Sequence, residues 1–100
     1  MAESRRVVRV SPNTLYRDLR GEGVLLQLES GQYFGLDEVA HRMWQLILEH
    51  GDLSVVEAEL LSEYAVEPET LSADLDRLVG QLAERKLLEI ETVPVEPNHT

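Results

Sequence analysis

The sequence predicts one α+β domain, in which a three-stranded antiparallel sheet is followed by three helices. Its 100 residues, 43% of them hydrophobic, are enough to close a single core. Apolar residues in the first third of the chain come in short β-branched or alternating runs, which is the strand pattern. From residue 38 to residue 86 they recur at helical spacing instead.

The first strand is expected at Arg5–Val10, a run of β-branched residues interspersed with arginines. Ser11-Pro12-Asn13 ends it, because proline cannot donate to a sheet ladder and asparagine favours turns. Residues 15–20 are ambiguous between a turn of helix and an irregular crossover, and are interpreted as a connection.

The second and third strands form a predicted hairpin. Residues 24–29 alternate, with Val24, Leu26 and Leu28 as the apolar face. Gly31 supplies the positive φ of a tight turn, so residues 32–36 fold back antiparallel. In a sheet ordered 1-2-3 the third strand is an edge, and its outer amides and carbonyls are open to a visiting peptide.

Three helices follow. The first is predicted at residues 38–50, with Asp37 as N-cap and Gly51 after its end. The second is expected to begin at a capping box formed by Ser54 and Glu57 and to end near residue 64. Pro68 suits the first turn of the third, which runs to about residue 86.

The third helix has one narrow apolar stripe. Leu71, Leu75, Leu78 and Leu82 follow one another at spacings of four, three and four. Val79 and Ala83 flank the stripe on one side; the polar flank consists of Asp74, Arg77, Gln81 and Arg85. Residues 87–91 read as a last extended segment. The domain is therefore expected over residues 1–92, with 93–100 as a flexible tail. This order of elements suggests a winged helix-turn-helix-like fold.

Composition argues against several functions. The formal charge of −10 opposes nucleic acid, since affinity for phosphate backbones comes from lysine and arginine. No cysteine is present, and no segment resembles a signal peptide or membrane span, so a cytoplasmic protein without membrane attachment is expected. The histidines, His41, His50 and His99, have no metal-ligand spacing, and no catalytic triad or phosphate loop is recognisable. We expect neither an enzyme nor a cofactor or metal.

Four stretches together resemble the PqqD-like family, the peptide-recognition domains of ribosomally synthesised and modified peptides. They are residues 21–26, residues 31–37, the set Ala40, Trp44 and Leu48, and residues 64–66 followed by 74–82. The resemblance extends over about residues 7–90, and its stand-alone length is most like the leader-binding protein of lasso-peptide pathways.

The resemblance implies a non-catalytic protein whose partner is the leader of a precursor peptide. The leader would add as an antiparallel strand to the third strand and lie in a cleft against the third helix, for delivery to a leader peptidase. The residues implied in binding are Gln32, Tyr33, Phe34, Gly35, Leu36, Asp74, Leu75, Arg77, Leu78, Val79 and Leu82.

Three alternatives stay open at this point. One is a PqqD-type peptide chaperone that serves a radical SAM enzyme, another is a winged-helix DNA-binding regulator, and the third is a subunit that only stabilises a larger enzyme. Packing in the core is a competing role for most of the apolar residues implied, and the simplest one for Trp44. Tyr33 is the better candidate for a peptide contact than Phe34 or Leu36.

Overall fold

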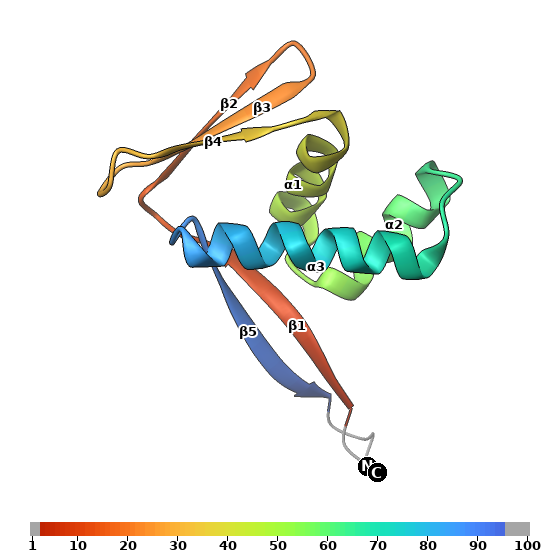
Figure 1. Cartoon of the computed structure of the whole chain (residues 1–100). Coiled ribbons are helices and arrows are strands. Elements are labelled where there is room, and N and C mark those ends of the chain that lie inside the picture. The colour runs from red at the N-terminus through yellow and green to blue at the C-terminus, as the bar shows by residue number, and fades with distance from the viewer. Residues whose placement is uncertain (1–2, 96–100) are drawn as a thin grey trace.

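The computed structural model describes residues 3–95, which form two small antiparallel sheets and three helices (Figure 1). The elements in chain order are β1 (Glu3–Val10), β2 (Thr14–Leu19), β3 (Glu22–Gln27), β4 (Tyr33–Leu36), α1 (Glu38–His50), α2 (Leu53–Glu63), α3 (Pro68–Glu84) and β5 (Leu88–Val95). The predicted fold class, a three-stranded antiparallel sheet followed by three helices, is confirmed.

The three-stranded sheet has the order β2-β3-β4, so its first strand is not the one predicted from sequence. Residues 14–19, interpreted above as a connection, pair with β3 from Thr14↔Gln27 to Leu19↔Glu22. The prediction failed because the leucines of β2, Leu15 and Leu19, point toward solvent and are 37% and 57% exposed. A strand whose apolar residues face outward lacks the usual alternation signal.

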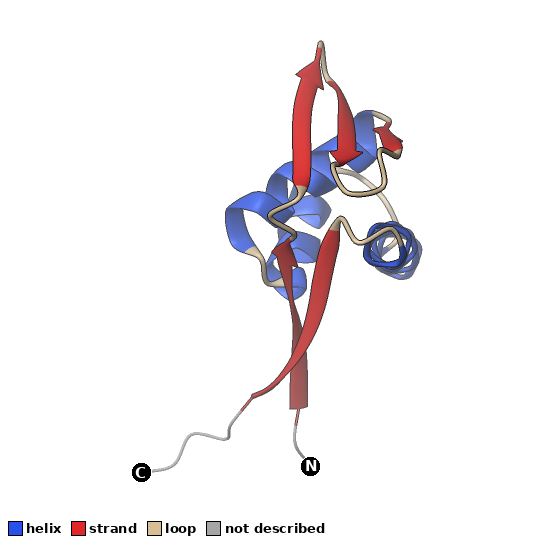
Figure 2. Cartoon of the chain, turned by 90° about the vertical axis from the view of Figure 1, so that its left-hand side faces the viewer, coloured by secondary structure: helices blue, strands red, loops and turns tan. Residues whose placement is uncertain are grey.

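The predicted first strand, Arg5–Val10, belongs instead to β1, which pairs with β5 in a separate two-stranded ribbon. The register runs from Glu3↔Val95 to Val10↔Leu88, so Glu3 and Val95 lie side by side at one end of the ribbon. Figure 2 shows the ribbon extending away from the helices, below the other sheet. The predicted extended segment at residues 87–91 is confirmed, and it continues through Val95; the rest of the predicted tail, residues 96–100, lies outside the described residues.

The buried face of β3 is the opposite of the one predicted. Leu25 and Gln27 are 0% and 2% exposed, whereas Leu28 is 55% exposed. Gln27 compensates for its burial with hydrogen bonds: its Oε1 accepts from the backbone N–H of Glu29 (2.6 Å) and Ser30 (3.2 Å). A strand with apolar residues on both faces does not show by alternation alone which face is covered.

The helices agree closely with their predicted bounds. In α1, Asp37 accepts from the Ala40 N–H at 2.9 Å, and Gly51 follows the helix with a φ of 73°. The N-cap of α2 is Asp52, not Ser54: its carboxylate accepts from the Ser54 N–H at 2.9 Å, so the cap lies two residues earlier than predicted. Aspartate caps a helix as well as serine does, and the helix begins at the earlier of the two residues. No helix in the described range 3–95 is long and apolar enough to cross a membrane.

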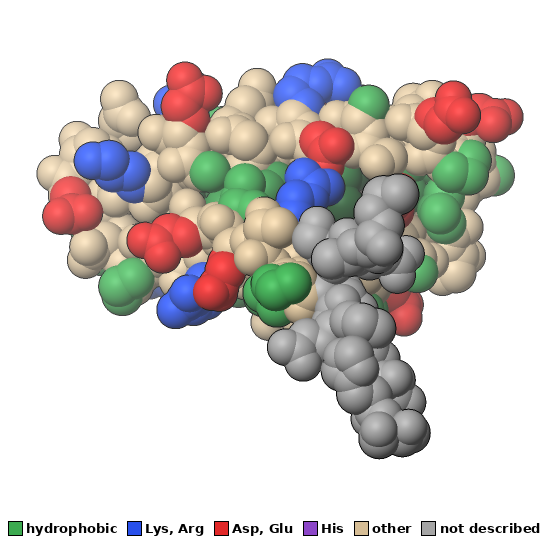
Figure 3. Space-filling view, turned by 90° about the horizontal axis from the view of Figure 1, so that it is seen from below, with side chains coloured by type: hydrophobic (Ala, Val, Ile, Leu, Met, Phe, Trp, Pro, Cys, Tyr) green, Lys and Arg blue, Asp and Glu red, His purple; other side chains and the backbone are tan. Residues whose placement is uncertain are grey.

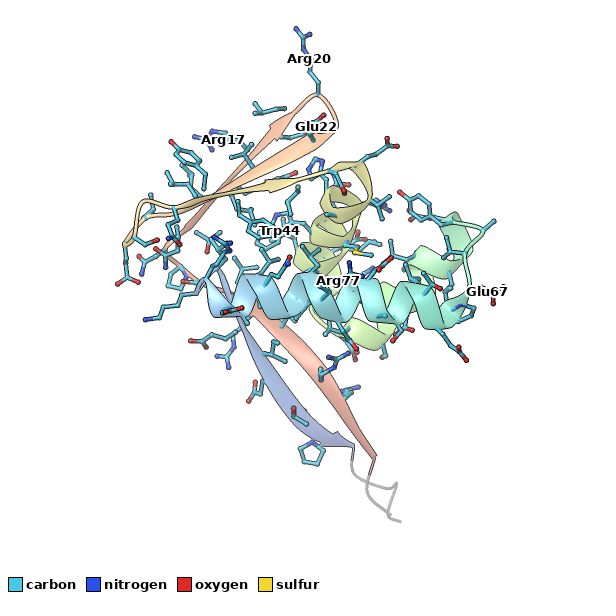
Figure 4. The ribbon with its side chains drawn as sticks, in the orientation of Figure 1. Arg17, Arg20, Glu22, Trp44, Glu67 and Arg77 are labelled. Atoms are coloured by element: carbon cyan, nitrogen blue, oxygen red, sulfur yellow. The ribbon has the colours of Figure 1, made fainter. Side chains whose placement is uncertain are left out.

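The core lies between α1, α2, α3 and the inner faces of both sheets. The apolar stripe predicted for α3 is confirmed, with Leu71, Leu75, Leu78 and Leu82 all buried. Trp44 is fully buried, as expected for a core residue, and lies between the β2-β3-β4 sheet and α3 (Figure 4).

A buried histidine fixes the sheet to α1. The Nδ1–H of His41 donates to the carbonyl oxygen of Gly21 at 2.8 Å, and its Nε2 pairs with the Tyr16 hydroxyl. The Tyr16 ring also packs against Trp44, with centroids 6.0 Å apart. These contacts hold the β2–β3 hairpin on α1 and so set the position of β4 above α3.

Candidate functional site

β4 is one of the two edge strands of the β2-β3-β4 sheet, and the one that lies on the α3 side of the molecule (Figure 1). β4 pairs with β3 on one side, and among the described residues no strand pairs with its other side. The backbone bonds at the β3–β4 turn show which way each residue faces. The backbone N–H of Gln27 donates to the Gln32 carbonyl at 2.9 Å, and the Gln27 carbonyl accepts from the Gly31 N–H at 2.8 Å, so Gln27 faces β4. The backbone N–H of the next residue, Leu28, donates to the Asn13 carbonyl at 2.8 Å, on the β2 side.

Backbone groups of successive residues in an antiparallel ladder alternate between the two neighbouring strands. Phe34 and Leu36, which pair with Leu25 and Gly23, therefore face β3 with their backbone groups. The N–H and C=O groups of Tyr33 and Gly35 face the open edge. Two residues thus offer a ladder of donors and acceptors to an incoming chain.

The side chains of β4 alternate between the two faces of the sheet. Leu36 is buried (2% exposed) and Phe34 is half-buried against the core, so both lie on the inner face, toward α3. Tyr33 is 70% exposed and lies on the outer face, opposite Leu26 and on the same side as Arg17, which Figure 4 shows pointing away from the helices. The backbone of Tyr33 faces the open edge, while its ring points away from α3.

Two cavities lie at the two ends of β4, on its α3 side. The first, the anchor cavity, has a volume of about 350 Å³ and an apolar floor from α1 and α3. It is lined by Asp37, Val39, Ala40, Met43, Asp74, Arg77, Leu78 and Gln81. The second, the turn cavity, has a volume of about 340 Å³ and is lined by Gln27, Glu29, Ser30, Gln32, Glu84, Arg85 and Lys86.

Phe34 and Arg85 lie between the two cavities. The guanidinium carbon of Arg85, at the C-terminal end of α3, is 5.3 Å from the centre of the Phe34 ring. This contact joins β4 to α3. We call the two cavities and the contact between them the β4–α3 groove; Figure 1 shows α3 passing beneath the sheet along it.

The structure brings together some of the predicted site residues in this groove and buries others beneath it. Gln32, Asp74, Arg77 and Leu78 line the cavities. Leu75, Val79 and Leu82 are at most 1% exposed and belong to the core under the groove. Their role there is to hold α3 at a fixed distance from the sheet.

Sequence reasoning missed several groove residues. Met43 and Gln81 line the anchor cavity, and Gln27 and Lys86 line the turn cavity. Gln27 was assigned to the outer face of its strand, and its Nε2 in fact donates to the Lys86 carbonyl at 3.2 Å, across the end of the groove. A polar residue in an apolar run was the available signal, but only the fold shows what it bonds to.

The charges of the anchor cavity are largely neutralised within the chain. Arg77 forms an ion pair with Asp74 one helical turn earlier, and Asp37 accepts from the N-terminus of α1. The cavity thus combines an apolar floor, formed by Ala40, Met43 and Leu78, with a polar rim whose charges are paired. No group of three His, Cys, Asp or Glu side chains that could hold a metal ion occurs within residues 3–95.

Residues 22–88 match the protein family described as "Coenzyme PQQ synthesis protein D (PqqD)". The chain belongs to the PqqD family. The match begins with β3 and ends at the first residue of β5, so it includes the whole β4–α3 groove. No curated protein matches the sequence.

Two solved structures of PqqD-like proteins share the fold. TbiB1 in complex with the TbiA(β) leader peptide superposes with a TM-score of 0.77 at 34% identity, over 81% of this chain and 94% of that one. Lasso peptide synthetase B1 complexed with the leader peptide superposes with a TM-score of 0.74 at 29% identity, over 82% of this chain and 96% of that one.

Proposed function

We propose that this PqqD-family chain is a non-catalytic binder of the leader region of a ribosomally synthesised precursor peptide. The leader adds as an antiparallel strand to the open edge of β4 and lies in the β4–α3 groove. The observation that carries the proposal is the free edge at Tyr33 and Gly35, next to two cavities that side chains of an added strand can reach. The leader-bound states of the two similar structures support it.

The energetics of such binding divide between backbone and pockets. Each backbone hydrogen bond contributes about 0.5–1.5 kcal/mol net, and most of this is offset by the entropy lost on association. An apolar leader side chain that fills the anchor cavity adds roughly 1.5–3 kcal/mol. The dissociation constant is therefore expected between about 1 nM and about 1 μM.

The next step after binding is delivery of the precursor to a processing enzyme, for which we propose the leader peptidase of a lasso-peptide pathway. The similarity to lasso peptide synthetase B1 favours this assignment. The family description favours an alternative, a chaperone that presents its peptide to a radical SAM enzyme. Co-purification of the leader-bound chain with each candidate enzyme distinguishes the two.

A matched pair of substitutions at Gly35 tests strand addition. The probe is the synthetic leader of the short precursor encoded beside this chain's gene, titrated by calorimetry. Gly35→Pro removes an outward N–H and is expected to weaken binding at least tenfold. A Cβ at Gly35 meets no atom within 4 Å, so Gly35→Ala is expected to bind like the wild type.

Two results would contradict the proposal. One is the absence of saturable binding to the wild-type chain. The other is equal affinity of the alanine and proline variants at Gly35, which would show that the edge of β4 takes no part. The thermal transition of both variants is measured in parallel, so that loss of fold is not mistaken for loss of binding.

A further inference from the structure

We propose that Arg85 and Lys86 bind an acidic side chain of the leader in the turn cavity. This residue would lie about four positions C-terminal to the apolar residue that fills the anchor cavity. The inference rests on the proposed function and adds to it a charge requirement on the peptide.

Unlike most of the basic residues, Arg85 and Lys86 form no ion pair within residues 3–95. Five of the nine basic residues, all arginines, form ion pairs with carboxylates: Arg5, Arg6, Arg9, Arg42 and Arg77. The side chains of Arg85 and Lys86 form no hydrogen bond or ion pair with any residue between 3 and 95. In a chain with a net charge of −10, two adjacent cations left unpaired in one cavity indicate an external acidic ligand.

Arg85 is held in a position suited to bind a carboxylate. Its guanidinium lies over the Phe34 ring, 5.3 Å from the centre, on the inner face of the edge strand. Within residues 3–95 the N–H groups of this guanidinium donate to no protein acceptor, and the Phe34 ring holds the charge beside β4. A carboxylate from a strand added to β4 would approach these N–H groups.

Lys86 occupies a backbone conformation that glycine favours. Its φ is 61°, and the bonds from Leu87 N to Leu82 O (2.9 Å) and from Lys86 N to Ala83 O (3.0 Å) form a Schellman motif at the end of α3. Glycine takes this conformation without steric cost. A lysine here is better explained by its ammonium group than by the needs of the turn.

Two carboxylates in the same cavity limit what it accepts. Glu29 and Glu84 line the cavity, but neither carboxylate has an oxygen within 4.0 Å of a side-chain nitrogen of Arg85 or Lys86. The Gln27 amide, 3.5 Å from Glu29 Oε1, holds that carboxylate on the turn side. One acidic leader side chain between the cations is therefore favoured, and a second one would be repelled.

The spacing follows from the length of β4. An antiparallel leader places its N-terminal half beside Leu36 and the anchor cavity, and its C-terminal half beside Gln32 and the turn cavity. From residue 36 to residue 32 an extended chain advances by about 13 Å, or about four residues. Because side chains of a strand alternate between its two faces, a spacing of about four residues also places the apolar and the acidic leader side chains on the same face, the one turned toward α3.

A peptide selection tests the charge requirement. Random 14-residue peptides are displayed against the immobilised full chain and against an Arg85→Gln/Lys86→Gly double variant. The wild type is expected to select an apolar residue followed about four positions later by Asp or Glu, and the double variant to keep the apolar residue and lose the acidic one. One selected peptide and its Gln-for-Glu counterpart are then titrated. The wild type is expected to prefer the acidic form by about fivefold and the double variant by less than twofold.

Control variants separate local recognition from net charge and from misfolding. Arg17→Gln/Arg20→Gln removes two cations from the other face and the tip of the β2–β3 hairpin (Figure 4), and should leave the acidic preference intact. Lys86→Gly alone suits the positive φ and should fold at least as stably as the wild type, while it lowers the preference.

The outcomes distinguish the two proposals. Enriched peptides without an acidic preference, or a preference that persists in the double variant, overturn this inference and leave leader binding standing. The absence of any enriched peptide overturns both.

Discussion

Gly23 lies on β3 directly against His41 of α1. A Cβ at this position would lie 2.8 Å from Cδ2 of His41 and 3.0 Å from Cδ1 of Leu36. His41 is held by two hydrogen bonds and cannot easily move away. We therefore expect Gly23→Ala to reduce the free energy of unfolding by about 1–3 kcal/mol, measured by denaturant titration. Gly35→Ala in the same sheet has open space around its Cβ and is the control; equal losses in both would contradict the packing argument.

The hydrogen bond between Tyr16 and His41 is a second test at the scale of single residues. His41 is 2% exposed, so removing the hydroxyl leaves its Nε2 without a partner in the interior. Tyr16→Phe should cost about 1–2 kcal/mol, seen as a lower thermal midpoint. Tyr33→Phe, at a side chain 70% exposed, should leave the midpoint unchanged. A Tyr16→Phe protein as stable as the wild type would show that the bond contributes nothing.

Single residues differ in how far their sequence context determines their role. The leucines of the α3 stripe were predicted to be on one face, and they are buried, because helical spacing specifies a face directly. Gln27 was placed on the wrong face, because its burial depends on backbone groups of the turn that follows it, at Glu29 and Ser30, and on the carbonyl of the distant Lys86. The pairing with Lys86 becomes visible only when the fold brings the end of α3 to the end of β3.

The ion pair between α1 and α2 allows a prediction at the scale of elements. The guanidinium of Arg42 and the carboxylate of Glu63 are joined by two hydrogen bonds. Arg42 Nε donates to Glu63 Oε1 at 2.8 Å, and Arg42 Nη2 donates to Glu63 Oε2 at 2.7 Å. The hydrogen bond from Arg42 lowers the pKa of Glu63 below its ordinary value of 4.5. A lowered folded-state pKa contributes stability above pH 4.5, and this stability is lost as the pH falls through the folded value.

The experiment compares wild type with Glu63→Gln across pH. The side chains are about one-third exposed, so the difference in unfolding free energy at pH 7 should be only about 0.5–1 kcal/mol. It should shrink below pH 4 as Glu63 is protonated in the wild type. A difference that is constant from pH 7 to pH 3 would show that the charge of Glu63 does not stabilise the helix pair.

Elements were predictable where a pattern and its ends agreed. In α1 the apolar residues recur at helical spacing, Asp37 caps the N-terminus and Gly51 follows the C-terminus, and the bounds of the helix match the prediction. β2 has none of these signals, because its leucines face solvent, and its assignment comes only from pairing with β3. The same lack of local signal hid the pairing of β1 with β5, whose partners are more than 70 positions apart in sequence. The open edge of β4 was nevertheless predicted, since it follows from the hairpin and not from the strand that lies beyond it.

For the molecule as a whole, charge favours a peptide over nucleic acid as partner. On the face shown in Figure 3, arginine and lysine side chains are interspersed with acidic ones and form no continuous basic stripe. A groove for a duplex needs such a stripe. The β4–α3 groove instead combines an unpaired strand edge with two cavities, and a free sheet edge beside side-chain pockets suits an extended peptide.

The two sheets share one core, which predicts a single unfolding transition. The ribbon is joined to the end of α1 by the bond from Val8 N to Gly51 O (2.7 Å), and the bond from Ser11 N to Leu87 O (3.0 Å) extends the β1–β5 pairing into the turn that follows α3. Val8, at 5% exposure, packs in the same cluster as Trp44. Unfolding in guanidinium chloride should therefore give coincident curves by Trp44 fluorescence and by far-ultraviolet circular dichroism.

Val8→Ala provides the sharper form of this test. It creates a cavity where the ribbon meets the helices, and should lower stability by about 1–2 kcal/mol in both signals together. Val55→Ala, at a residue 38% exposed on α2, should have a smaller effect. If the circular dichroism transition moved to lower denaturant while the fluorescence transition stayed in place, the ribbon would be an independently melting unit. The position of β4 above α3 would then not depend on the ribbon.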